Sequence, residues 1–195
     1  LNHINLGEVC TVLLSRGVAH TQYFLPYMLQ NSNSLLFVSD GIKSHNKNLK
    51  LFEDLSLKGV SNLHYITFRD NFCVFIEIVN SLIKSSVVSN STVFRDIVFN
   101  FRSCLREMLI SQFEVKLYER SLDRFLCNLR NSGIFNIVVI SGEMFTPYNA
   151  VIGSTSAKFD IKSIQLQTSM VDYWPQVKFV FCDKFVFTSY QAYKF

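Results

Sequence analysis

The chain is poor in the residues that build linkers and phosphate-binding loops. Its 195 residues include only seven glycines and three prolines, which leaves no Gly/Ser-rich tether between separate parts. The dinucleotide fingerprint GxGxxG, the P-loop pattern GxxxxGK[ST] and the nucleophile-elbow pattern GxSxG are all missing from the sequence. These absences exclude the usual dinucleotide-binding loop, a P-loop nucleotide site and a serine hydrolase of the nucleophile-elbow type.

The sequence also lacks paired cysteines of the kind that bind zinc, and it lacks long apolar runs. Five cysteines are present, and no two of them form a CxxC pair, which argues against a zinc site and against a disulfide framework. Cys10 and Cys182 fall in expected buried strands, where cysteine acts as a small hydrophobe. No run reaches the roughly 20 apolar residues of a membrane span, and no signal peptide is visible. We expect a cytoplasmic protein with reduced, mostly buried cysteines and no bound metal.

Charge is sparse and dispersed. Charged residues make up 17% of the chain, and the formal net charge is +4. Nucleic-acid binders usually gather Lys and Arg on one face or in runs, whereas the basic residues here are scattered, so we expect no nucleic-acid partner. The arginines between positions 95 and 130 are interleaved with acidic residues. A solvated helix face explains them most simply, and peripheral contact with the anionic lipid of an inner membrane is the alternative.

Hydrophobic residues make up 49% of the chain, which is typical of a globular domain. Apolar runs predict strands at 9–15, 34–39, 63–68 and 135–141, with further strands at 162–167, 179–181 and 184–188. Helical spacing predicts helices at 20–31, 46–57, 71–84, 92–110, 114–131 and 147–158. The alternation predicts an α/β, Rossmann-like open parallel sheet with helices on both faces. We expect residues 1–195 to form one domain, with a helical insertion at about 71–131.

Ligands of such sheets bind beyond the carboxyl ends of the strands, which directs attention to loops 15–20, 39–46, 68–71, 141–147 and 167–176. The first reads SRGVAH and contains Arg16, Gly17 and His20, with Thr21 following. Glycine lets the backbone approach a ligand, and the N–H groups of the next helix favour an anion or a sugar oxygen. His20 is either a capping or packing residue or a ligand contact and base.

The fourth loop reads SGEMFTPYN and contains Glu143 just after the clearest strand, FNIVVIS. A carboxylate there can accept a hydrogen bond from a hydroxyl or remove its proton. It can equally cap the helix that follows, since acidic residues suit helix N-termini. The fifth loop contains Trp174, the only tryptophan. Its ring either stacks on a sugar or packs under the edge of the sheet.

Three stretches together resemble a known family. SRGVAHTQYFLPYMLQ is similar to the first loop and helix of GT-B glycosyltransferases. ISGEMFTPYNAVIGSTSAKFDIKSIQLQTS and DKFVFTSYQAYKF resemble segments of the bacterial transferases that assemble surface polysaccharides. The resemblance covers mainly residues 9–31 and 135–195. It departs from the family at LQHG, which reads LQTS here, with Thr168 and Ser169 in place of His and Gly.

The resemblance implies the acceptor-binding, N-terminal half of a GT-B enzyme, with a nucleotide-sugar-binding domain expected beyond residue 195. The acceptor would be a carbohydrate or a lipid-linked sugar, and the donor a nucleotide-sugar bound mainly outside this chain, with no cofactor. His20 and Glu143 are the candidate bases. The cleft would be lined by Arg16, Gly17 and Thr21, with Gln167, Thr168 and Trp174 on its far side. The alternatives are a sugar-nucleotide epimerase, a glycerophosphate transferase or a non-catalytic module whose apolar middle helices bind a partner.

Overall fold

In the computed structural model, a single parallel sheet organises the chain. The structure describes residues 7–16, 18–39, 59–88, 102–142, 147–166 and 182–186. Within these ranges six parallel strands are ordered β3-β2-β1-β4-β5-β6, the strand order of Rossmann-type sheets. The α/β, Rossmann-like prediction is therefore confirmed. The strands are β1 Cys10–Ser15, β2 Ser34–Val38, β3 Gly59–Ser61, β4 Ile137–Ser141, β5 Lys162–Leu166 and β6 Lys184–Val186.

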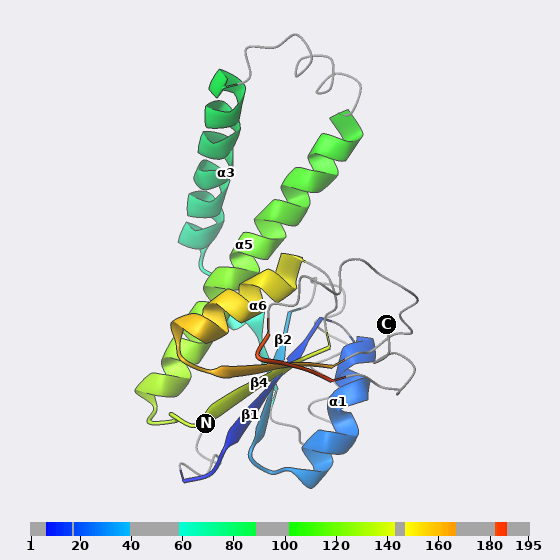
Figure 1. Cartoon of the computed structure of the whole chain (residues 1–195). Coiled ribbons are helices and arrows are strands. Elements are labelled where there is room, and N and C mark those ends of the chain that lie inside the picture. The colour runs from blue at the N-terminus through cyan, green and yellow to red at the C-terminus, as the bar shows by residue number, and fades with distance from the viewer. Residues whose placement is uncertain are drawn as a thin grey trace.

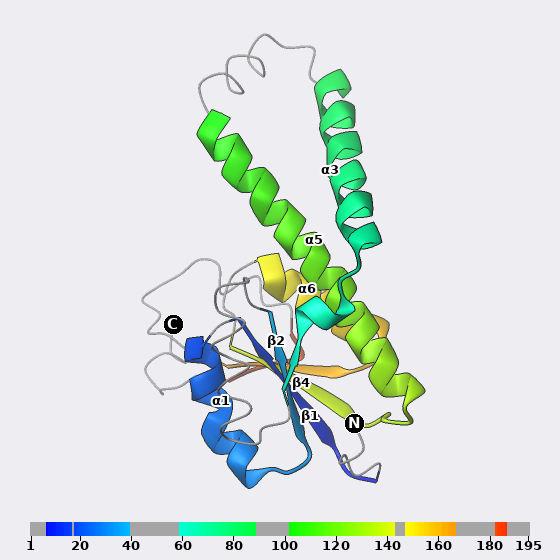
Figure 2. The same cartoon turned by 180° about the vertical axis from the view of Figure 1, so that it is seen from behind.

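Helices cover both faces of the sheet. α1 lies on one face, and the second half of α5 lies with α6 on the other, as the two opposed views show (Figures 1 and 2). Among the described residues, no helix has both the length and the apolar character needed to cross a membrane. The helical segments are α1 Val18–Gln30, the 3-10 helix η1 Asn62–Tyr65, α3 Phe68–Val88, α5 Arg102–Asn131 and α6 Pro147–Lys158.

The side chains of β1 and β2 alternate between two buried clusters. Leu13 and Leu36 point to the α1 face, where Phe24 and Met28 cover them. Their neighbours in the strands point to the opposite face and form the larger cluster with α5 and α6. At its centre, Phe37 of β2 and Phe125 of α5 stack with their ring centroids 4.7 Å apart. Both faces of the central strands are therefore buried, which explains their unbroken apolar runs.

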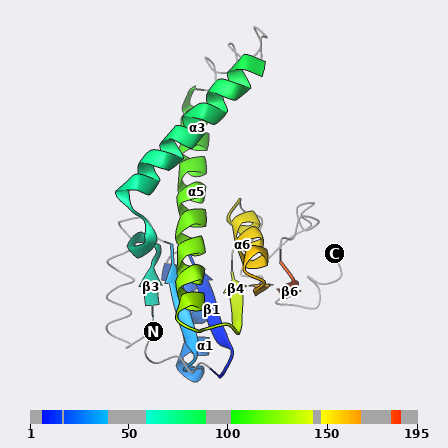
Figure 3. The same ribbon diagram turned by 90° about the vertical axis from the view of Figure 1, so that its left-hand side faces the viewer.

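α3 and the first half of α5 extend well beyond the sheet (Figure 3). The order of the elements explains why the two helices project from this side of the sheet. α3 follows the carboxyl end of β3 through η1, whereas α5 leads to the amino end of β4. Since α5 runs from beyond the carboxyl edge back along the sheet, the first half of α5 and α3 form a helical hairpin on the carboxyl side. Ligands bind on this same side in parallel sheets.

The strand predicted at 63–68 is wrong. β3 ends at Ser61, whose side chain accepts a hydrogen bond from the Leu63 N–H, 3.2 Å away, and caps η1. Thr67 and Asp70 then start α3 as a reciprocal capping box: the Asp70 carboxylate accepts from the Thr67 N–H, 2.7 Å away, and the Thr67 hydroxyl accepts from the Asp70 N–H. The pattern T-x-x-D is a known start signal for helices, so the expected loop 68–71 is the first turn of α3.

The two helices predicted at 92–110 and 114–131 are not separate, because one helix runs without a break from Arg102 to Asn131. Ser111 and Gln112, where the break was expected, are neither Gly nor Pro, so nothing there interrupts the backbone hydrogen bonds. α5 ends as expected at the Ser132-Gly133 pair, where Gly133 has a φ of 85°. Ile134 N–H donates to Leu129 O, which completes a Schellman-type cap.

The helix predicted at 71–84 is longer at both ends, since α3 spans Phe68–Val88. The remaining predicted elements in the described ranges agree with the structure within one or two residues, and α6 has the predicted bounds, Pro147–Lys158. The helix predicted at 46–57 and the strand at 179–181 lie outside the described residues. Of the cysteines that the structure describes, Cys10, Cys73, Cys127 and Cys182 are free thiols. Cys10 is buried, but Cys73 and Cys182 are half-buried and Cys127 is exposed, so these three do not fit the expectation of buried cysteines.

Replacing Phe125 tests whether the stacked pair with Phe37 holds α5 on the sheet. Phe125 is fully buried, so Phe125→Ala should lower the free energy of unfolding by about 3–5 kcal/mol, because a large cavity opens in the core. Phe135→Ala is the matched control, since Phe135 is largely exposed. Urea denaturation measures both. Equal, small losses for the two variants would show that the Phe125 contact is not essential.

Candidate functional site

The strand order reverses between β1 and β4, and ligands of Rossmann-type sheets bind at such a point. β1 pairs with β2 on one side and with β4 on the other. The chain leaves β1 towards α1 on one face of the sheet and leaves β4 towards α6 on the opposite face (Figure 1). In open α/β sheets the ligand crevice lies outside the carboxyl ends of two strands whose following helices diverge in this way. The residues of these two loops and of the adjoining strand ends are therefore the candidate site.

The turn after β1 is firmly anchored. The Ser15 and Thr21 hydroxyl oxygens lie 3.0 Å apart and link the last residue of β1 to the first turns of α1. Ser15 O also accepts a hydrogen bond from Ser39 N–H at the end of β2, 2.8 Å away. Thr21 is 0% exposed. It therefore holds the turn in place, and its contact with a substrate stays a prediction.

Arg16 links the end of β1 to the start of α6. Its guanidinium carbon lies 3.5 Å from the centre of the Tyr148 ring, within the range of a cation–π contact. Tyr148 is the second residue of α6, so one side chain from the β1 loop rests on one from the start of α6. Tyr148 is itself buried and meets Tyr118 of α5 edge to face, at 5.1 Å between centroids. The guanidinium is thus held at the reversal point by a rigid aromatic support.

Small polar residues end the neighbouring strands, and sequence reasoning missed their role. Asn62, just after β3, is buried and donates from Nδ2 to the Ser39 hydroxyl oxygen, 3.3 Å away. On the other side of β1, Ser141 of β4 is paired in register with Gln165 of β5, and both are buried. For Ser39, Asn62 and Ser141 the signal was a polar residue at the end of a strand or directly after it. These residues give the carboxyl edge hydrogen-bonding capacity along its length.

The structure describes only part of the predicted site. His20 lies in the first turn of α1, but its side chain is outside what the structure describes. Glu143, a candidate base, also lies outside the described residues. The same is true of the predicted lining residues Gly17, Gln167, Thr168 and Trp174. Arg16 and Thr21 are therefore the predicted contacts whose surroundings can be described, and the pairing of His20 with Glu143 across the crevice stays a prediction.

A hollow on the opposite edge of the sheet is a weaker candidate. It is lined by Gly153, Ala157, Asp160, Lys162 and Asp183, among others, and it lies by the amino ends of β5 and β6. Asp183 accepts hydrogen bonds from Ser163 N–H and Ser163 Oγ, 2.7 and 2.9 Å away. These bonds hold the pKa of the Asp183 carboxyl below its usual value. They fasten β6 to β5, so this carboxylate has a structural role.

The comparisons with known proteins leave the family open. The chain matches no protein-family model, no curated protein and no solved structure. The resemblance to GT-B glycosyltransferases therefore rests on the residues quoted for it. In the ranges that the structure describes, no cluster of His, Cys, Asp or Glu is arranged to hold a metal ion.

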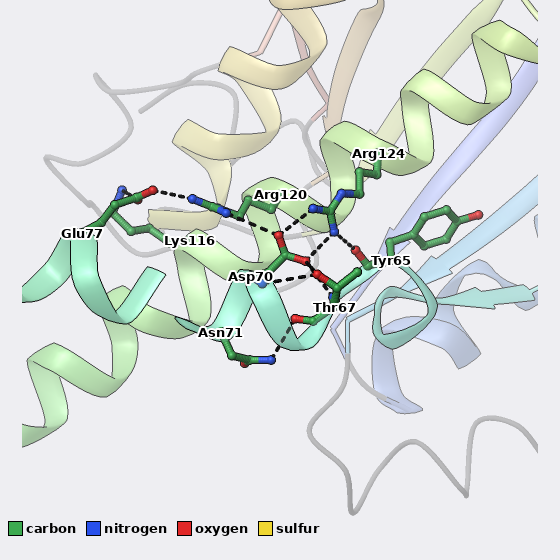
Figure 4. A network of polar contacts seen from close by, with 8 residues as sticks. All are labelled: Tyr65, Thr67, Asp70, Asn71, Glu77, Lys116, Arg120 and Arg124. Atoms are coloured by element: carbon green, nitrogen blue, oxygen red, sulfur yellow. Dashed lines mark hydrogen bonds and ion pairs between the residues drawn. The ribbon is translucent and has the colours of Figure 1, made fainter. Parts of the chain in front are cut away.

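The most strongly shifted carboxylate among the described residues belongs to an ion-pair network between α3 and α5. Figure 4 shows Asp70 of α3 pointing towards Arg120 and Arg124 of α5. Arg124 binds it with both terminal nitrogens, Nη1 to Oδ2 at 2.5 Å and Nη2 to Oδ1 at 2.6 Å, and also donates to Tyr65 O at 2.7 Å. Arg120 Nη1 lies 3.3 Å from Asp70 Oδ1.

The network continues along the helix pair to an exposed end. Arg120 also pairs with Glu77, and Lys116 Nζ lies 3.2 Å from Glu77 Oε2. Lys116, Arg120 and Arg124 are four residues apart on α5, while Asp70 and Glu77 are seven apart on α3, so both sets lie on facing helix sides. These arginines belong to the 95–130 cluster expected to form a solvated face. Arg120 and Arg124 are instead bound to α3.

The environment of Asp70 indicates a structural role. Its side chain is only 2% exposed. The hydrogen bond from Arg124 holds the pKa of Asp70 far below its usual range; burial opposes this shift, and the hydrogen bonds from Thr67 add to it. A carboxylate with such a low pKa remains ionised at neutral pH and cannot act as a base there. The Asp70–Arg124 pair therefore fastens the start of α3 to α5.

Replacing Asp70 should destabilise the chain in a pH-dependent way. Asp70→Asn leaves two arginines without their carboxylate, and we expect a loss of about 2–3 kcal/mol at pH 7, less than for a fully buried pair because Arg124 is partly exposed. The unfolded chain binds a proton at Asp70 near pH 4, where the folded chain does not. The contribution is therefore complete at neutral pH and shrinks as the pH falls below about 5.

Glu77→Gln is the matched control, because it removes a carboxylate from the exposed end of the same network and should cost at most about 1 kcal/mol. Urea denaturation of the wild type and both variants from about pH 3 to pH 7 makes the comparison. The structural role assigned to Asp70 would be contradicted if Asp70→Asn lowered the free energy of unfolding by the same amount at every pH. It would also be contradicted if the decrease only equalled that of Glu77→Gln.

Proposed function

We propose that this domain binds the acceptor in a glycosyltransferase that moves a sugar from a nucleotide-sugar to a surface-polysaccharide acceptor. The observation that carries the proposal is the contact between Arg16 and Tyr148. It holds a guanidinium at the point where the strand order of a Rossmann-type sheet reverses, and it joins the end of β1 to the start of α6. The resemblance of residues 9–31 and 135–195 to GT-B enzymes supports the same choice.

The reaction would be a substitution at the anomeric carbon of the donor. The acceptor hydroxyl oxygen forms a bond to that carbon, the bond to the nucleoside diphosphate breaks, and the diphosphate leaves with the electron pair. The hydroxyl proton passes to a base. His20 suits this task near neutral pH because the ordinary pKa of an imidazole is about 6.5. Glu143 would either act with a raised pKa or orient the acceptor.

The remaining residues would position the acceptor. The Arg16 guanidinium presents several N–H donors in a fixed plane, and its stacking on Tyr148 limits the rotamers that it must lose on binding. Such a group suits sugar hydroxyls or the phosphate of a lipid-linked sugar. Gly17 would allow close approach of the backbone, Thr21 would keep the turn in place, and the far side would be formed by Gln167, Thr168 and Trp174.

The donor would bind mainly to a second domain, because no phosphate-binding glycine loop occurs in residues 1–195. We therefore expect isothermal titration of this chain with UDP-, CMP- or GDP-sugars to give no measurable heat of binding at micromolar concentrations. A micromolar dissociation constant for any of them would assign the donor site to this domain and would overturn the acceptor-binding role.

Substitutions at the candidate bases test the reaction directly. In the complete two-domain protein, His20→Ala or Glu143→Ala should lower turnover by about a hundredfold or more, the usual loss when a general base is removed. Arg16→Ala should mainly raise the KM for the acceptor, because Arg16 is assigned to binding. Transfer of radiolabelled sugar to the lipid and polysaccharide fractions measures these rates, with urea denaturation run in parallel.

The controls are an exposed histidine and an exposed glutamate away from the crevice, His64 in η1 and Glu114 on α5. His64→Ala and Glu114→Gln should leave turnover unchanged. If His20→Ala loses about 2 kcal/mol or more of stability while activity per folded molecule stays normal, His20 is a packing residue. The same outcome for Glu143→Ala would leave the proposed reaction without a base.

A non-catalytic module that binds a partner is the second candidate. The observation that favours it is the exposed apolar side of α3, which bears several large side chains. Normal transfer activity in the His20 and Glu143 variants, together with tight binding of a partner through α3, would favour this alternative.

A further inference from the structure

We draw no further inference here: the strongest candidate, the exposed apolar face that Phe68, Phe72 and Phe75 form on α3, carries no proposal because nothing in the described part of the chain shows what covers it.

Discussion

The packing of α5 against the sheet is the contact on which the other features depend. Phe125 stacks on Phe37 of β2, and Leu122, Leu126 and Leu129 are buried in the same cluster. α5 precedes β4, and β4 pairs with β1 on the side opposite β2. The helix therefore fixes where the strand order reverses. Its first half continues past the carboxyl edge and carries α3, so one helix supports both the crevice and the projecting hairpin.

The crevice and the hairpin rest on one connected set of aromatic rings. Arg16 lies on Tyr148, and Tyr148 meets Tyr118, which contacts Phe37 at 6.2 Å between centroids. On the other side of the Phe37–Phe125 stack, Tyr65 meets Phe125 edge to face at 5.5 Å. Its carbonyl oxygen accepts the hydrogen bond from Arg124, the arginine that binds Asp70. Rigid aromatic packing thus positions both the Arg16 guanidinium and the base of α3.

The parts of this architecture that follow from local pattern could be predicted from the sequence. The runs CTVLLS and IVVIS are mainly apolar because helices cover both faces of the sheet, and the alternation of strands with helices sufficed to predict a parallel sheet. β3 was missed because only three residues form it. The following LHYITF has a strand-like composition, but Ser61 caps η1 and the Thr67–Asp70 box begins α3.

The candidate site was predictable in location and only partly in composition. The loop rule pointed to Arg16 and to the start of α6, but the stacking of Arg16 on Tyr148 joins residues far apart in the sequence, and no spacing predicts it. The same holds for the pairing of Asp70 with Arg124. Helical periodicity predicts which residues share a side of α3, whereas only the position of α5 decides that the side bearing Phe72 remains exposed.

Amide hydrogen exchange tests most directly whether α5 and the sheet form one unit from which the hairpin projects. The account predicts that amides of β1, β2, β4 and residues 118–129 of α5 exchange only through global unfolding, with one common free energy of opening. Amides of α3 should exchange through a smaller, local opening, because ion pairs at its base hold it more than apolar packing does. Exchange of residues 118–129 as fast as that of α3, while the strands stay protected, would contradict the account.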